Sequence, residues 1–118
     1  MTREERENNA RGLHRQGCNC CQAVVAAWAD RLPIAGEAAM NVAAPFGRGL
    51  AGMREVCGCV SGMAMVCGLT GHTADVRGLI EKFRQENGDI VCGRLLATGK
   101  KPCRELVADA AGLLADVM

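Results

Sequence analysis

The chain has 118 residues, of which 49% are hydrophobic, 23% charged and only 3% aromatic, and its formal net charge is +1. This length is enough for one domain with its own core, so we predict a single domain over residues 1–118. A near-neutral chain without tyrosine lacks both the basic excess and the aromatic platforms of nucleic-acid-binding proteins. We therefore expect no nucleic-acid partner.

Residues 3–16 and 20–32 are predicted to form the first two helices. Thr2 with Glu5, and Asn19 with Gln22, have the spacing of capping boxes, in which each side chain satisfies a free backbone amide at a helix start. We place the first helix over residues 3–16 and the second over 20–32. Gly17 supplies the turn between them, and an apolar stripe of three- and four-residue steps runs along the second helix.

Residues 57–69 carry almost no charge and follow a short predicted helix at 37–43 and a Gly-rich loop at 47–52. We interpret residues 57–69 as a central, buried helix. Gly58 and Gly62 are four residues apart on one face, where they would let a neighbouring backbone or a bulky cofactor approach closely. A pair of buried strands is the alternative, but the segment lacks the β-branched residues that strands favour.

Three more helices are predicted in the last third of the chain, over residues 73–86, 90–97 and 103–117. Asn87-Gly88 ends the first of them, Asp89 precedes the second, and Pro102 stands near the start of the third. No segment alternates with a period of two. The sequence therefore predicts an all-α, single compact domain of about five or six helices around a central buried helix that contains glycine and cysteine.

The eight cysteines are the main clue to function. Residues 1–9 are too polar for a secretory signal, and every apolar run is interrupted before it reaches the length of a membrane span. We therefore expect a cytoplasmic protein without direct membrane insertion. In that reducing compartment, cysteines serve more often as ligands, redox thiols or buried hydrophobic residues than as disulfides.

Four of the cysteines fall at or beside the predicted starts of four different helices: Cys20, Cys57, Cys92 and Cys103. The free amides and the positive dipole end of a helix start stabilise a thiolate, and with it a metal or an anionic cluster. Their spacings are far longer than those of zinc fingers, so a shared site would exist only in the folded chain. The alternative is four unrelated buried thiols.

Five short motifs follow one another along the chain: residues 19–24 (NCCQAV), 46–49 (FGRG), 56–62 (VCGCVSG), 92–96 (CGRLL) and 101–107 (KPCRELV). Together and in this order they resemble the C_GCAxxG_C_C family, whose members are assigned redox activity from their cysteines. The resemblance spans residues 10–117 and matches Cys20, Cys57, Cys92 and Cys103 to the four family cysteines. It implies redox activity and names no substrate. Members are often described beside transporter genes.

The sequence departs from the family pattern at four further thiols. Cys21 and Cys59 stand where the family has small residues, and Cys18 and Cys67 are additional. We retain these four as extra redox thiols. They leave open which sulfurs are ligands, and above all whether Cys20 or Cys21 is one.

The first functional hypothesis is a centre for electron transfer or redox sensing, in which Cys20, Cys57, Cys92 and Cys103 hold an iron–sulfur cluster, with zinc as the alternative metal. Thiolates are soft ligands that suit both. Haem is set aside because the sequence has no C-x-x-C-H motif.

Two other hypotheses need no metal. Cys18 and Cys21 form a C-x-x-C at a predicted helix start, which is typical of thiol–disulfide redox chemistry, although such motifs normally follow a strand. The other hypothesis is that the chain is a non-catalytic partner of a transporter or redox enzyme. We also expect a homodimer, because several helices are apolar on more than one face.

The remaining motifs do not define a reaction, and whether the chain is an enzyme is left open. Gly47-Arg48-Gly49 lacks the strand and the Lys-Ser/Thr ending of a nucleotide-binding loop. Arg48 and Arg54 flank this loop and either balance the charge of a centre or are solvated. His14 and His72 are isolated, and we expect surface or capping roles for them.

Overall fold

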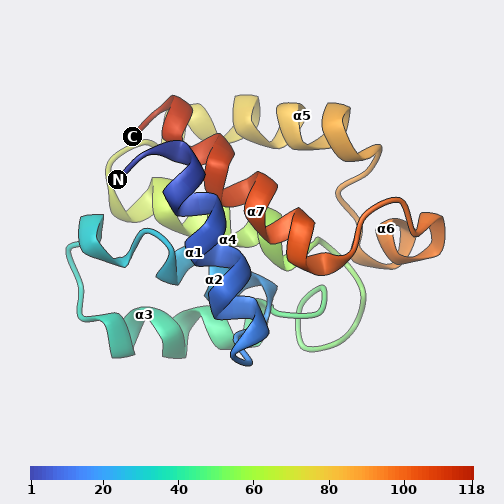
Figure 1. The fold of residues 1–118 in the computed structure, drawn as a ribbon, viewed down its shortest axis with the longest axis horizontal. Helices are drawn as coiled ribbons and strands as arrows, with labels where there is room; N and C mark the ends of the chain where they lie inside the picture. Colours follow the sequence, from blue (N-terminus) through green and yellow to red (C-terminus); the bar gives the residue numbers. More distant parts are fainter.

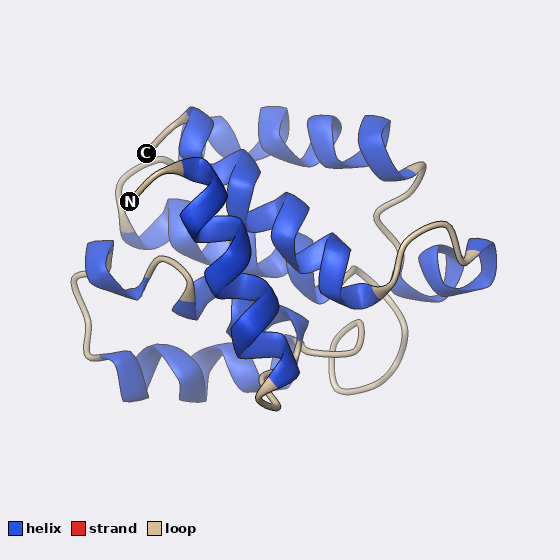
Figure 2. Ribbon diagram, in the orientation of Figure 1, coloured by secondary structure: helices blue, strands red, loops and turns tan.

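The computed structural model describes all residues, Met1–Met118, and consists of helices and loops without a strand (Figure 2). Seven α-helices follow one another: α1 (Arg3–Arg15), α2 (Cys20–Ala26), α3 (Gly36–Ala43), α4 (Gly58–Leu69), α5 (Val76–Asn87), α6 (Cys92–Thr98) and α7 (Cys103–Leu113). The all-α prediction is confirmed, but five or six helices was too low a count. Three of the helices have only seven or eight residues, a length that owes its stability to packing rather than to sequence propensity.

The predicted helix starts at Thr2 and Asn19 are confirmed as complete capping boxes. The predicted end of the second helix at Leu32 is wrong, because α2 stops at Ala26 and a 3-10 turn, Ala29–Arg31, follows. Trp28 lies in this break, where its indole Nε1 donates to the carbonyl oxygen of Ala111 on α7 at 2.9 Å. A long-range contact therefore ends a helix that the local pattern would continue.

Helix α4 lies in the interior of the fold, with α2, α5 and α7 packed around it (Figure 1). Six of its first nine residues are buried and the other three are half-buried, while Gly68 near its end is exposed. The prediction of a buried helix rather than two strands is confirmed. The only β-type pairing is an isolated bridge between Val56 and Val91, which connects the segments just before α4 and α6.

Gly58 and Gly62 lie where α4 crosses α2. A Cβ atom added at Gly58 would come within 3.0 Å of the Cys21 amide nitrogen and 3.1 Å of the Cys20 Cβ. One added at Gly62 would stand 2.9 Å from the Val24 Cβ. The absence of side chains at these two positions lets the helix backbones approach each other closely, as the sequence predicted.

Arg6 connects the N-terminal helix to the core. Its side chain is 3% exposed, donates to the Ala27 carbonyl oxygen at 3.0 Å and to the Asp30 carboxylate, and lies 3.9 Å over the Trp28 ring centroid. The charge of this buried guanidinium is paired and both of its terminal nitrogens donate, whereas its Nε atom has no hydrogen-bond partner. These contacts attach helix α1 to the segment that follows α2.

No helix of the structure has both the length and the apolar character to span a bilayer.

Replacing Gly62 by alanine is expected to destabilise the fold by about 1–3 kcal/mol, because the new methyl group overpacks the α2–α4 crossing. Gly68 on the same helix is the matched control. Nothing lies within 4 Å of its added Cβ, so Gly68→Ala should be neutral or stabilising by up to about 1 kcal/mol. Urea unfolding followed by Trp28 fluorescence measures both. Equal effects of the two substitutions would contradict the close crossing.

Candidate functional site

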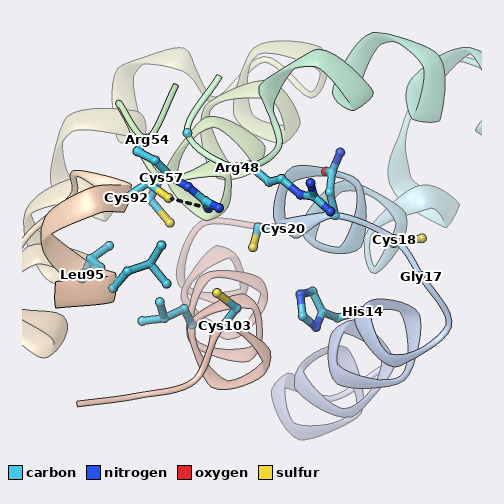
Figure 3. A pocket seen from close by; sticks show the side chains of 15 residues that line it. His14, Gly17, Cys18, Cys20, Arg48, Arg54, Cys57, Cys92, Leu95 and Cys103 are labelled. Carbon is cyan, nitrogen blue, oxygen red and sulfur yellow. Dashed lines mark hydrogen bonds between the residues drawn. The ribbon is translucent and has the colours of Figure 1, made fainter. Parts of the chain in front are cut away.

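One pocket of about 280 Å3 brings together the four cysteines that the sequence singles out. Cys20 and Cys103 are the first residues of α2 and α7, Cys92 is the first residue of α6, and Cys57 is the N-cap of α4. All four line the pocket. Figure 3 shows the sulfurs of Cys20 and Cys103 directed toward one another, with Cys57 and Cys92 across the cavity. Four segments far apart in sequence thus present thiols to one space.

The bridge between Val56 and Val91 holds two of these thiols side by side. The Cys57 amide donates to the Ile90 carbonyl oxygen at 2.8 Å, and the Cys92 amide donates to the Glu55 carbonyl oxygen at 2.7 Å. Two helix starts are therefore connected through their backbones just before each helix begins. This pairing fixes the separation of Cys57 and Cys92 independently of their side chains.

The other four cysteines are distributed differently. Cys18 is half-buried and lines the pocket, but Figure 3 places its sulfur apart from the other four. Cys21, Cys59 and Cys67 are fully buried in the core and do not line the cavity. Of Cys20 and Cys21, between which the sequence could not decide, the structure brings Cys20 to the pocket.

Cys20 is the most acidic thiol of the group. A hydrogen bond from Cys59, together with the nearby His14 and a hydrogen bond from Cys103, lowers the pKa of Cys20 to about 6, although burial acts in the opposite direction. Cys20 is therefore largely a thiolate at neutral pH. Its partner Cys103 keeps its proton, because burial and the negative charge of Cys20 raise its pKa to about 11.

Cys59 hydrogen-bonds to two sulfurs of the site, those of Cys20 and Cys57. Its contact also lowers the pKa of Cys57, against the effect of burial. The same two hydrogen bonds and complete burial hold the pKa of Cys59 well above its ordinary value. Burial, and to a smaller extent the negative charge of Cys20, raises the pKa of Cys21 to about 12. Cys59 is thus a neutral donor and Cys20 an acceptor.

The ionisable residues at the pocket, apart from its thiols, are all basic types: His14, Arg48 and Arg54. The Arg54 Nη1 atom donates to the Cys92 Sγ atom at 3.7 Å, drawn as a dashed line in Figure 3. No aspartate or glutamate lines the cavity. The site therefore suits negative charge at its centre, which is consistent with the presence of a thiolate.

His14 is a site residue for which sequence reasoning predicted only a surface or capping role. It lies in the last turn of α1, and the Cys18 amide bonds back to the Leu13 carbonyl oxygen at 3.1 Å, so that the chain reverses within Gly17 and Cys18. This tight reversal brings the end of α1 beside the start of α2. The signal was available in the short Gly17 connection. His72, in contrast, contacts Asp75 at 3.2 Å and does not line the pocket.

The thiols have the chemistry for a metal centre but are not assembled around a single ion. No three cysteine, histidine, aspartate or glutamate side chains are arranged to hold one metal ion. A zinc ion requires sulfurs about 2.3 Å from a common point, so it does not fit this arrangement without movement.

The fold and the pocket together define a small, all-α, cysteine-rich domain with its thiols gathered at helix starts. A family model described as "Putative redox-active protein (C_GCAxxG_C_C)" matches residues 18–117, and the chain belongs to this family. The resemblance noted from the motifs is thereby confirmed. Comparison with curated proteins and with solved structures gives no significant match.

The low pKa of Cys20 predicts its reactivity in the reduced, metal-free protein. Alkylation of Cys20 by iodoacetamide should increase with a midpoint near pH 6, because the reactive thiolate forms above the pKa. Cys59→Ala removes the main hydrogen bond and should shift this midpoint to higher pH. Cys67→Ala, which removes a buried thiol elsewhere, is the control. Peptide mass spectrometry measures each site, and an unchanged midpoint in Cys59→Ala would contradict the assignment.

Proposed function

We propose that the protein is an electron-transfer or redox-sensing protein that holds an iron–sulfur cluster through Cys20, Cys57, Cys92 and Cys103. The observation that carries this proposal is the convergence of these four cysteines, from four separate helix starts, on one pocket. Thiolates are the usual ligands of such clusters, and the family is one of redox-active proteins. When bound, the cluster would supply one-electron transfer.

The charges around the pocket support an anionic guest. A cluster with four thiolates is negative, and Arg48, Arg54 and His14 line the cavity without any carboxylate. The Arg54 contact with Cys92 supplies a hydrogen bond to one of the proposed ligand sulfurs. Such contacts and local positive charge favour the more reduced state of a cluster and so influence its potential.

Anaerobic purification followed by reconstitution with iron and sulfide tests the proposal. We expect visible absorbance, with iron and acid-labile sulfide in stoichiometric amounts. Serine variants of each of the four cysteines should lower or abolish both. Cys67→Ala is the matched control, because Cys67 is buried in the core and away from the pocket.

Two outcomes would refute the cluster. The first is reconstituted protein without stoichiometric iron and sulfide. The second is equal loss of iron from the control and the four pocket variants, which would indicate nonspecific binding to thiols. Bound zinc in place of iron, measured in the same samples, would favour the zinc alternative.

A metal-free dithiol is the second candidate function, and the Cys20–Cys103 contact favours it. The Cys20 thiolate would attack one sulfur of a small-molecule disulfide and release one thiolate. Cys103 would then lose its proton and attack the Cys20 sulfur, which releases the second thiolate and leaves a Cys20–Cys103 disulfide. Two electrons pass to the small molecule. The Cys18–Cys21 pair is less suited, because Cys21 is buried with a raised pKa.

Differential thiol labelling separates the two functions. If the dithiol operates, oxidation of the metal-free protein by a small-molecule disulfide should remove two hydrogen atoms, that is two protons and two electrons, and the loss of free thiol should be confined to Cys20 and Cys103. Unchanged labelling at both residues would exclude it. A cytoplasmic location, a homodimer and a redox or transporter partner stay predictions from the sequence.

A further inference from the structure

The Gly-rich loop between α3 and α4 holds two arginines at the mouth of the cysteine pocket. Arg48 and Arg54 have φ angles of 56° and 59°, in the left-handed region that few non-glycine residues adopt. The Arg54 amide donates to the Arg48 carbonyl oxygen at 3.2 Å. The two residues are therefore connected to each other through the backbone, and both line the same cavity.

Neighbouring contacts fix this loop in place. A Cβ atom at Gly49 would stand 2.6 Å from the Arg54 Cα, so only glycine permits the two sides of the loop to approach so closely. The Arg54 carbonyl oxygen accepts from the Gly93 amide at 3.1 Å, which attaches the loop to the start of α6. The positions from which the two guanidinium groups extend are thus determined by backbone contacts.

Neither guanidinium group is paired with a carboxylate. The ten ion pairs of the structure involve other residues, and no acidic side chain lines the pocket. The one side-chain hydrogen bond of the pair is that from Arg54 to the Cys92 sulfur. Arginine presents several donors in a fork that matches two oxygens of one anion. The two guanidinium groups consequently keep several N–H donors that have no partner in the protein.

We propose that Arg48 and Arg54 form a receptor, at the mouth of the cysteine pocket, for a small oxyanion of the phosphate or sulfate type. The oxyanion is either a free ion or the charged group of a small organic ester. The two arginines line the same pocket as the proposed sulfur ligands, but their guanidinium groups bind the anion without a metal, so the receptor exists in the metal-free protein. It accounts for the Gly47-Arg48-Gly49 sequence without a nucleotide-binding loop, because two side chains rather than backbone amides bind the anion.

Calorimetric and NMR titrations with sodium sulfate, sodium phosphate and glycerol phosphate test the receptor at constant ionic strength. We expect saturable binding with amide shifts centred on residues 47–55. In the Arg48→Gln/Arg54→Gln double variant the affinity should fall by at least about tenfold, since two charge-assisted contacts are lost. The Arg48→Lys/Arg54→Lys variant keeps the charges but not the forks and should show intermediate affinity.

Arg94→Gln is the matched control. Arg94 is 72% exposed on the neighbouring helix α6, pairs with Asp89 and does not line the pocket. Its loss removes the same charge, and we expect less than about a twofold change in affinity because Arg94 is solvent-exposed, already paired with Asp89 and outside the pocket. Circular dichroism verifies that each variant is folded.

No saturable binding to the wild-type protein, or equal weakening in Arg94→Gln and the double variant, would overturn the receptor. Tighter binding of glycerol phosphate than of inorganic phosphate identifies an organic ester as the ligand class, and the reverse identifies a free ion. Titrations of metal-free protein keep the result separate from cluster assembly. Anion binding without a cluster refutes only the proposed function, and a cluster without anion binding refutes only the receptor.

Discussion

The close approach of α2 and α4 is the constraint on which the rest of the site depends. Gly58 lies against the first turn of α2, so near that its missing side chain would touch the Cys20 Cβ, the Cys21 amide and the Phe46 carbonyl oxygen. Two cysteine-bearing helix starts and the base of the Gly-rich loop therefore meet at one point. A side chain at this position would separate Cys20 from Cys57 and shift the loop that carries the arginines.

Two further contacts complete the pocket from other parts of the chain. The bridge between Val56 and Val91 brings α6, and with it Cys92, beside the start of α4. The packing of α7 against α1 and α2 brings Cys103 to the same end of the fold (Figure 1). Four helix starts consequently face one cavity. The free amides and positive dipole ends of helix starts favour thiolates, so the arrangement stabilises negative sulfur before any cofactor is considered.

The sequence predicted what depends on local chemistry. Both capping boxes, the buried nature of α4 and the position of the four cysteines at helix starts follow from nearby residues, and the structure agrees with them. The early end of α2 was missed because the Trp28 contact with Ala111 spans 83 positions. The place of His14 at the pocket was missed because it depends on the tight reversal at Gly17, and the role of Arg54, which the sequence left open between two alternatives, depends on left-handed loop residues. No periodic pattern encodes either of these features.

Cys59 shows how a departure from the family pattern is accommodated by the same electrostatics. The family has a small residue here, whereas this chain has a fully buried thiol that hydrogen-bonds to both Cys20 and Cys57. Cys59 keeps its proton because its two neighbours hold negative charge more readily and because it has no access to solvent. It therefore stabilises two sulfurs of the pocket without lining it. An additional cysteine near the pocket need not be an additional ligand, since a neutral, buried thiol can instead donate a hydrogen bond to the sulfurs that line the pocket.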